Sequence, residues 1–254
     1  MTDPVKGPAK GTAEGRIATP RLSRLARAAA SAGTDAAPPP IDPEGRCELC
    51  SEPLPERHRH LLDLETTRLL CACQACSLLM DHQAAGGGHY RLIPDEAREI
   101  VDLELPDPLW NALGVPVELA FLVHSTPREG VTAFYPGAMG ATEARPDPDA
   151  WAEVVAGNPV LADLVPDVEA LLVRRVDAER RGWIAPIDAC FRLTGQIRTR
   201  WRGLAGGSEV FAAIQDFFEG LSRTARAVDR RGRPAEASAR GAAAAPHTSQ
   251  EAMQ

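Results

Sequence analysis

The sequence predicts an α+β protein in which a small cysteine-rich module precedes a larger domain with an antiparallel sheet and C-terminal helices. Five of the six cysteines lie between positions 47 and 76. Beyond them, short apolar segments typical of strands occur in neighbouring pairs. The clearest helical periodicity comes near the C-terminal end of the chain. Adjacent strand pairs with helices between and after them are typical of an α+β domain.

The cysteines are spaced as in a metal site. Cys47 and Cys50 form one Cys-x-x-Cys pair, and Cys73 and Cys76 form a second pair about twenty residues later. Each pair directs two sulfurs at one point, so together they supply the four thiolates of a tetrahedral site. Zinc is the expected metal, and iron in a rubredoxin-like site is the alternative. Serine follows each pair, where rubredoxin-type pairs commonly have glycine, and this difference favours zinc.

The same segment holds three further donors, so the spacing alone leaves the choice of ligands open. Two short strands are predicted around a tight turn at residues 65–67. This register places His60 opposite Cys71 on one face of the hairpin. It places His58 opposite Cys73 on the same face. Cys71 is then a small buried apolar residue or an additional thiolate, and the two histidines are exposed residues, hydrogen-bond partners of thiolates or ligands.

We expect four segments along the chain. They are a disordered arm at 1–43, a zinc-ribbon-like metal module at 44–94, an α+β domain at 95–226 and a disordered tail at 227–254. The arm is rich in Ala, Pro, Gly and Thr, a composition that buries too little apolar surface to fold. A transient helix at 20–31 is the alternative to plain disorder within it.

Within the larger domain, periodicity and turn residues predict alternating strands and helices. Strands are expected at 99–105, 117–124, 131–135, 169–176 and 183–187, with a charged turn at 177–182. Helices are expected from residue 107, at 147–156, at 187–201 and at 208–225. Asp107 and Asp147 each precede a proline and are expected to cap their helices. Cys190 lies on an apolar helical stripe and is expected to be a core residue.

Charge is distributed unevenly and bears on possible partners. Residues 1–40 carry six Lys or Arg and three acids, and residues 223–254 repeat those counts, so each end has a net charge of +3. The chain as a whole has a formal net charge of −7, which leaves −13 for the residues between. Such a folded part repels a phosphate backbone, so a zinc-ribbon nucleic-acid regulator is a less favoured hypothesis.

Several other classes of protein are also disfavoured. No apolar run approaches the roughly eighteen residues that a membrane helix needs, and the N-terminus lacks the apolar region of a secretion signal. We therefore expect a cytoplasmic protein, in which clustered cysteines indicate metal binding rather than disulfides. Because the usual nucleophile-elbow, phosphate-loop and dinucleotide-binding motifs are missing, we do not expect an enzyme.

A set of short motifs, taken in order, resembles an uncharacterised family encoded beside actinobacterial [NiFe]-hydrogenase genes. The motifs are Cys47-x-x-Cys50, His58-Arg59-His60-Leu61-Leu62-Asp63, Cys71-x-Cys73-x-x-Cys76, Tyr90-Arg91-Leu92, Phe134-Tyr135-Pro136, Asn158-Pro159, Pro186-Ile187-Asp188 and Trp201-Arg202-Gly203-Leu204. The resemblance covers residues 45–222. It implies an association with hydrogenase assembly, maturation or electron transfer, and hydrogenase subunits or maturation factors as partners.

These observations lead to two main hypotheses. The first is a metal-binding accessory protein that acts through protein-protein contacts, with zinc locking the hairpin. Its contact surface is expected to include the hairpin and the basic, aromatic corner at residues 198–202. The second is a redox or electron-transfer protein that holds iron at the same cysteines.

Overall fold

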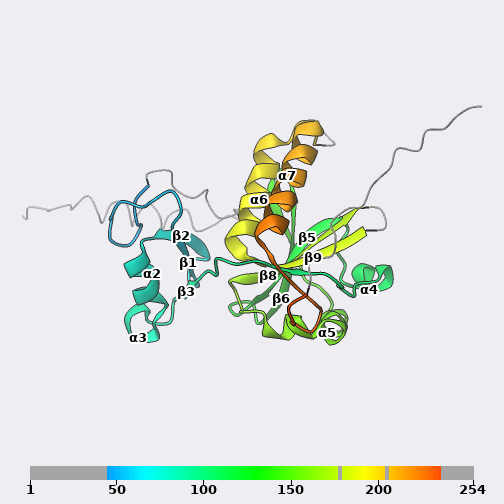
Figure 1. The fold of residues 1–254 in the computed structure, drawn as a ribbon, viewed down its shortest axis with the longest axis horizontal. Coiled ribbons are helices and arrows are strands. Elements are labelled where there is room, and N and C mark those ends of the chain that lie inside the picture. The colour runs from blue at the N-terminus through cyan, green and yellow to red at the C-terminus, as the bar shows by residue number, and fades with distance from the viewer. Residues whose placement is uncertain (1–44, 177–178, 204–205, 236–254) are drawn as a thin grey trace, which may run out of the picture. The chain divides into compact units, whose positions relative to one another are not determined.

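The computed structural model describes residues 45–176, 179–203 and 206–235. The predicted arm at 1–43, the helix considered at 20–31 and the chain beyond residue 235 lie outside these ranges. Within them the chain forms two sheets, one of three strands and one of seven (Figure 1). The predicted mixed α+β class, with an antiparallel sheet and C-terminal helices, is confirmed.

The cysteine-rich segment forms the smaller sheet, which has the strand order β2-β1-β3. Its elements are β1 (Arg59–Asp63), β2 (Arg68–Ala72), α2 (Gln74–Asp81), α3 (Gln83–Gly86) and β3 (Tyr90–Leu92). Asp63 closes the turn after β1, because its carboxylate accepts hydrogen bonds from the N–H groups of Glu65 and Thr66 at 2.9 and 3.2 Å. The turn sets the pairing, and His60 lies opposite Cys71 as predicted.

The larger sheet has the strand order β10-β4-β9-β8-β5-β6-β7. Its strands are β4 (Arg98–Ile100), β5 (Leu119–Ser125), β6 (Gly130–Gly137), β7 (Gly140–Ala144), β8 (Glu169–Val176), β9 (Glu179–Pro186) and β10 (Arg226–Val228). The helices between and after them are α4 (Asp107–Ala112), α5 (Pro148–Gly157), the 3-10 helix η1 (Pro159–Asp163), α6 (Ile187–Arg200) and α7 (Ser208–Thr224). Neighbouring strands are antiparallel except β10 and β4, which are parallel.

Apolar layers cover both faces of the larger sheet, and β8 shows how they are divided. Ala170 and Leu172 pack with residues of α6 and α7, whereas Leu171 and Val173 pack with residues of α4 and α5. Successive side chains of a strand point to opposite faces, so a strand covered on both sides needs a continuous apolar run. Figure 1 shows the α6–α7 pair on the opposite side of the strands from α5.

Helix α5 begins and ends where the sequence predicts. The carboxylate of Asp147 accepts two hydrogen bonds from N–H groups in the first turn. Pro148 occupies the first helical position, where its missing N–H forfeits no intrahelical bond. At the other end, Asn158 is fully buried, and its side chain bonds both backbone groups of Glu104. The polar residues around this helix therefore fix its length and anchor the neighbouring loop.

Two predictions about local structure are wrong. Asp107 does not cap α4, because the N-cap residue is Pro106, and no side chain caps the helix. Asp107 instead accepts hydrogen bonds from Arg180 and Arg175. The bond from Arg180 is the main reason why the pKa of this carboxyl lies below its usual value. The predicted charged turn at 177–182 is also too long, since β9 already begins at Glu179.

The sequence also misplaced several boundaries and missed six elements. The strand expected at 99–105 ends at Ile100, and α2, α3, β3, β7, η1 and β10 were not predicted. The structured chain continues past the expected boundary at 227, because Val228 of β10 is buried and pairs with Ile100. In the part of the chain that the structure describes, no helix is long and apolar enough to cross a membrane.

Candidate metal centre

The first cysteine pair lies in a tight turn that precedes β1. The N–H of Ser51 donates to the carbonyl of Cys47 at 2.8 Å, and the N–H of Cys47 donates to the carbonyl of Glu52 at 2.8 Å. Ser51 has a φ of 66°, in the left-handed region that glycine adopts most readily. The serine that follows Cys50 thus takes the conformation that glycine usually supplies at this point.

The second pair is built into the start of α2. Cys73 is the N-cap residue, and its Sγ accepts a hydrogen bond from the N–H of Cys76 at 3.4 Å. The N–H of Ser77 donates to the carbonyl of Cys73 at 2.9 Å. Ser77 is buried, and its hydroxyl donates to the carbonyl of Gln74. The serine after this pair therefore closes the first helical turn, and the turn holds both cysteines on one side.

The structure brings the four predicted ligands together. The Sγ atoms of Cys47, Cys50, Cys73 and Cys76 all lie within 4.8 Å of one another. The Sγ atoms of Cys50 and Cys73, which come from different pairs, are 3.8 Å apart. Four sulfurs that each lie about 2.3 Å from a tetrahedral zinc ion are about 3.8 Å from one another, which matches this separation. Cys47 is buried and Cys50 is exposed, so the group lies at the surface with one protected side.

The four thiols influence one another's acidity. Burial raises the pKa of Cys47, but backbone hydrogen bonds from both cysteine pairs outweigh it and lower the pKa to about 6. Burial raises the pKa of Cys76, and hydrogen bonds and negative charge from the neighbouring cysteines raise it further. One thiolate in the group therefore opposes ionisation of the next. A divalent cation at the centre reverses this effect and favours four thiolates.

His58, His60 and Cys71 do not join the four cysteines but form a group of their own. One nitrogen of each imidazole and the Sγ of Cys71 lie within 4.8 Å of one another. Cys71 is buried, and the two histidines are half-buried. The sequence left Cys71 open between an apolar residue and an additional thiolate. The structure places its sulfur with the two imidazoles.

The sequence did not identify two residues near this second group as site residues. Asp188, at the start of α6, accepts a hydrogen bond from Nδ1 of His60 at 2.8 Å. Glu48 accepts one from the N–H of Cys71 at 2.6 Å. Glu48 lies between Cys47 and Cys50 in the sequence, and this position could have identified it as a site residue. Asp188 lies 128 positions from His60 and gave no local signal.

The remaining cysteine has no role in either group. Cys190 lies on the buried stripe of α6 and is fully buried, which confirms its prediction as a core residue. Burial raises the pKa of its thiol well above the ordinary value. A thiol in this state is protonated at neutral pH and is a poor nucleophile.

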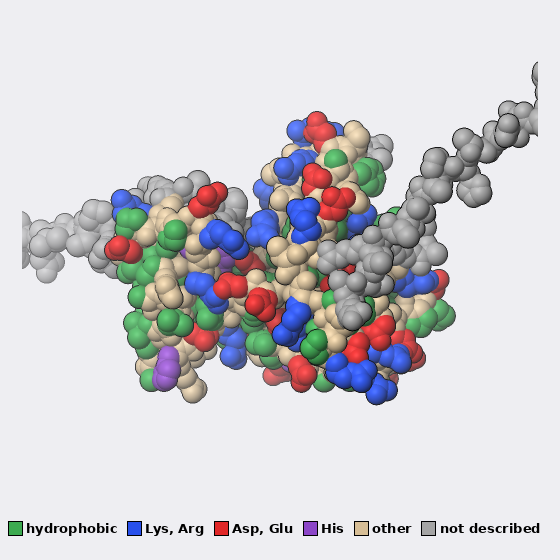
Figure 2. All heavy atoms as spheres, viewed as in Figure 1, with side chains coloured by type: hydrophobic (Ala, Val, Ile, Leu, Met, Phe, Trp, Pro, Cys, Tyr) green, Lys and Arg blue, Asp and Glu red, His purple; other side chains and the backbone are tan. Residues whose placement is uncertain are grey.

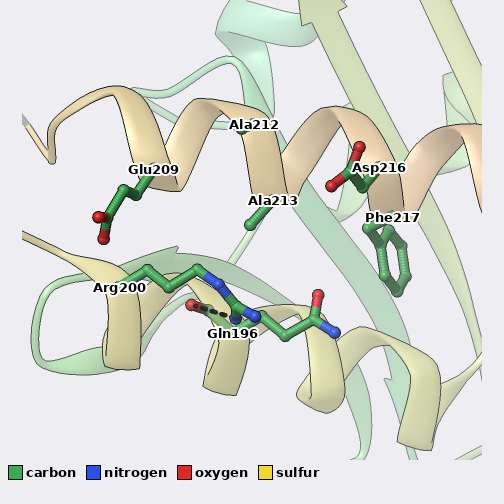
Figure 3. A pocket seen from close by; sticks show the side chains of 7 residues that line it. All are labelled: Gln196, Arg200, Glu209, Ala212, Ala213, Asp216 and Phe217. Carbon is green, nitrogen blue, oxygen red and sulfur yellow. Dashed lines mark hydrogen bonds between the residues drawn. The ribbon is translucent and has the colours of Figure 1, made fainter.

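The basic corner at residues 198–202 lies at the end of α6. The guanidinium groups of Arg200 and Arg202 donate to backbone carbonyls in the last turn, which favours the end of the helix. A groove of about 480 Å³ runs between α6 and α7 beside it. Figure 3 shows Arg200 reaching back along α6 while Glu209 and Asp216 project from α7. The groove thus contains both signs of charge.

Charge on the visible surface is also mixed. On the face drawn in Figure 2, Lys and Arg side chains are interspersed with Asp and Glu over both the cysteine-rich segment and the larger sheet. Neither sign gathers there into a continuous patch. This face therefore offers no extended basic surface for a phosphate backbone.

Comparison with known proteins places the chain in a family. Residues 46–225 match the Family of unknown function (DUF5947). The chain belongs to this family. The DUF5947 match begins next to Cys47 and ends directly after α7, so it includes both groups of candidate ligands and all of the larger sheet except β10. No curated protein and no solved structure matches the chain.

Proposed function

We propose that the chain is a metal-binding accessory protein whose zinc-ribbon-like module holds one Zn²⁺ at Cys47, Cys50, Cys73 and Cys76. The convergence of four sulfurs from two separate turns within 4.8 Å carries this proposal. Thiolates prefer zinc, copper(I) and iron over magnesium or calcium, and four of them form a closed site without a position for substrate. The ion therefore has a structural role, and the protein acts through contacts with other proteins.

Elemental analysis and an absorption spectrum of the full chain purified without oxygen test the metal site. We expect zinc in a colourless protein, with one equivalent lost in the Cys50→Ser variant. Cys50 is exposed, so this substitution removes a ligand with little effect on packing. Cys190→Ala is the matched control, since it removes a buried cysteine outside both groups and should retain the metal. Unchanged metal content in Cys50→Ser contradicts the proposed site.

Iron at the same four cysteines is the second candidate. The exposure of Cys50 favours it, because a ligand at the surface gives an electron a short route to a partner. A ferric tetrathiolate absorbs strongly in the visible range, whereas zinc does not. The same spectrum therefore separates a rubredoxin-like electron-transfer protein from a structural zinc protein.

The motifs quoted above support a further part of the proposal, an association with [NiFe]-hydrogenase assembly, maturation or function. Candidate partners are hydrogenase subunits or maturation factors, and the hairpin and the corner at 198–202 are the proposed contact surface. Deleting the gene should lower hydrogenase activity or impair subunit processing. Complementation with the wild-type gene should restore both, and Cys50→Ser should not. Normal activity and processing in the deletion strain contradict this association.

A further inference from the structure

The group of His58, His60 and Cys71 has the geometry of a second metal site. His60 and Cys71 lie directly opposite each other in the β1-β2 hairpin. His58 precedes His60 by two positions, so strand alternation directs it to the same face. The two imidazole rings are 4.9 Å apart at their centroids and nearly perpendicular, at 81°. One backbone feature, the hairpin register, thus brings two imidazoles and one sulfur to a single point.

Hydrogen bonds leave one nitrogen of each imidazole available as a ligand. Nδ1 of His58 lies 3.0 Å from the carbonyl oxygen of Pro55. A carbonyl only accepts, so Nδ1 carries the proton and Nε2 carries the lone pair. Nδ1 of His60 donates in the same way to the Asp188 carboxylate at 2.8 Å, which leaves Nε2 of that ring as the acceptor. Both rings are therefore in the tautomer that binds a metal through Nε2.

The surroundings of the group also match those of a metal site. Nε2 of His58 is buried and has no hydrogen-bond partner among the residues that the structure describes. A buried acceptor without a partner costs free energy, and a bond to a metal ion removes that cost. The carboxylate of Asp188 orients the ring of His60 as second partners of metal-bound histidines do. The side chains of His60 and Asp188 are only 16% and 14% exposed, so water weakens their interaction little.

We propose that His58, His60 and Cys71 bind a second divalent transition-metal ion, distinct from the ion held by the four cysteines. Two imidazoles and a thiolate favour zinc and similar ions over magnesium or calcium. Three protein ligands leave a fourth position for an exchangeable ligand, in contrast to the closed site of four cysteines. Binding converts the thiol of Cys71 into a thiolate and releases its proton to solvent.

Titration of the metal-free full chain with Co²⁺ under anaerobic conditions tests the proposal. Cobalt replaces zinc in such sites and gives visible bands whose intensity reports thiolate ligation. We expect two equivalents bound by the wild type and one by His58→Ala, with the bands of the four-cysteine site retained. Retention of those bands also shows that the module of the variant is folded. His89→Ala is the matched control, because this histidine is in the same module but pairs with Glu65, and it should bind two equivalents.

The two sites fail in different ways in this experiment. One equivalent in the wild type that survives His58→Ala and is lost in Cys50→Ser overturns the second site and leaves the first. One equivalent that survives Cys50→Ser and is lost in His58→Ala overturns the first site and leaves the second. A wild type that binds no cobalt overturns both.

A substitution at Asp188 separates a positioning role from a purely structural one. Asp188→Asn keeps the shape of the side chain but removes the charge that orients His60. We expect Co²⁺ affinity at the second site to fall about 10- to 100-fold, with affinity at the four-cysteine site unchanged. Equal affinity in the variant and the wild type contradicts the role of Asp188.

Discussion

The cysteine-rich segment and the seven-stranded sheet are stabilised by different means. The apolar cluster around the cysteines has four buried members, Cys47, Leu61, Leu70 and Ala72, and one of these four is a candidate ligand. The larger sheet is covered on both faces by apolar layers that contain Trp110, Trp183 and Phe218. A segment with so few buried side chains cannot offset the entropy of ordering its chain by burial alone. Metal ligation at the proposed four-cysteine site would supply the additional interaction.

The hairpin of the smaller sheet is intermediate between these two regions in how much apolar packing supports it. Leu62 of β1 is buried in the same apolar cluster as residues of the larger sheet. The two cysteine pairs lie outside the paired part of β1 and β2, and none of their four cysteines belongs to the cluster that contains Leu62. Dependence on metal should therefore be greatest in the two turns that carry the cysteines and smaller in the hairpin between them.

Removal of the metal is expected to have the largest effect. After chelation, amide hydrogen exchange should become fast at residues 46–52 and 73–81. It should speed up only partly in β1 and stay slow in β5 and β8. Structural zinc contributes roughly 10–16 kcal/mol in zinc-finger peptides, which is more than such a small apolar cluster supplies. Exchange measured by mass spectrometry checks this. Continued protection of both cysteine turns in the chelated protein contradicts metal-dependent folding.

Truncation of a side chain in the apolar layer should lower the stability of the larger domain and leave metal binding unchanged. Phe218 of α7 is buried, and its ring centroid lies 4.8 Å from that of Trp183. Phe218→Ala leaves a cavity and should lower the free energy of unfolding by about 3–5 kcal/mol, measured by urea denaturation. Metal content should not change. Phe211→Ala is the control on the same helix, because Phe211 is 65% exposed and its loss should cost less than about 0.5 kcal/mol. Equal effects of the two substitutions contradict this assignment of the core.

A buried polar anchor should have a smaller effect on the same domain. Asn158 is fully buried, and its side chain donates to the carbonyl of Glu104 and accepts from its N–H, both at 2.8 Å. Asn158→Ala leaves these backbone groups without partners and should cost about 1–3 kcal/mol in a urea titration. Asn111→Ala, at an exposed position of α4, should be nearly neutral. A neutral Asn158→Ala variant indicates that water replaces the side chain.

Sequence reasoning succeeded where local chemistry decides the structure. The register that pairs His60 with Cys71 follows from the turn and from strand alternation. The cap at Asp147 follows from a residue type and the proline after it. The spacing of the cysteines identified the four residues whose sulfurs converge. Each of these features involves residues close together in the sequence or a repeat with strong geometric consequences.

Sequence reasoning failed where distant residues decide the structure. Asp107 does not cap its helix as predicted, because its carboxylate accepts hydrogen bonds from arginines about seventy positions away. Strand β10 is three residues long and forms through its pairing with β4, so it carries almost no pattern of its own. The partner of His60 lies on a helix of the larger domain. Spacing identified the two cysteine pairs but left the role of Cys71, His58 and His60 open, and only the structure places these three in a group of their own.

Loss of a surface ion pair should change the free energy of unfolding least among these substitutions. Arg128 donates to Glu143 at 2.9 Å, but the two side chains are 38% and 50% exposed. Water and salt screen this pair, and the position of Arg128 over the ring of Phe134 adds little at an exposed site. Arg128→Ala should lower the free energy of unfolding by less than about 1 kcal/mol, and the loss should shrink further at high salt. A loss comparable to that of Phe218→Ala would mean that surface charge, rather than the apolar layers, stabilises the larger sheet.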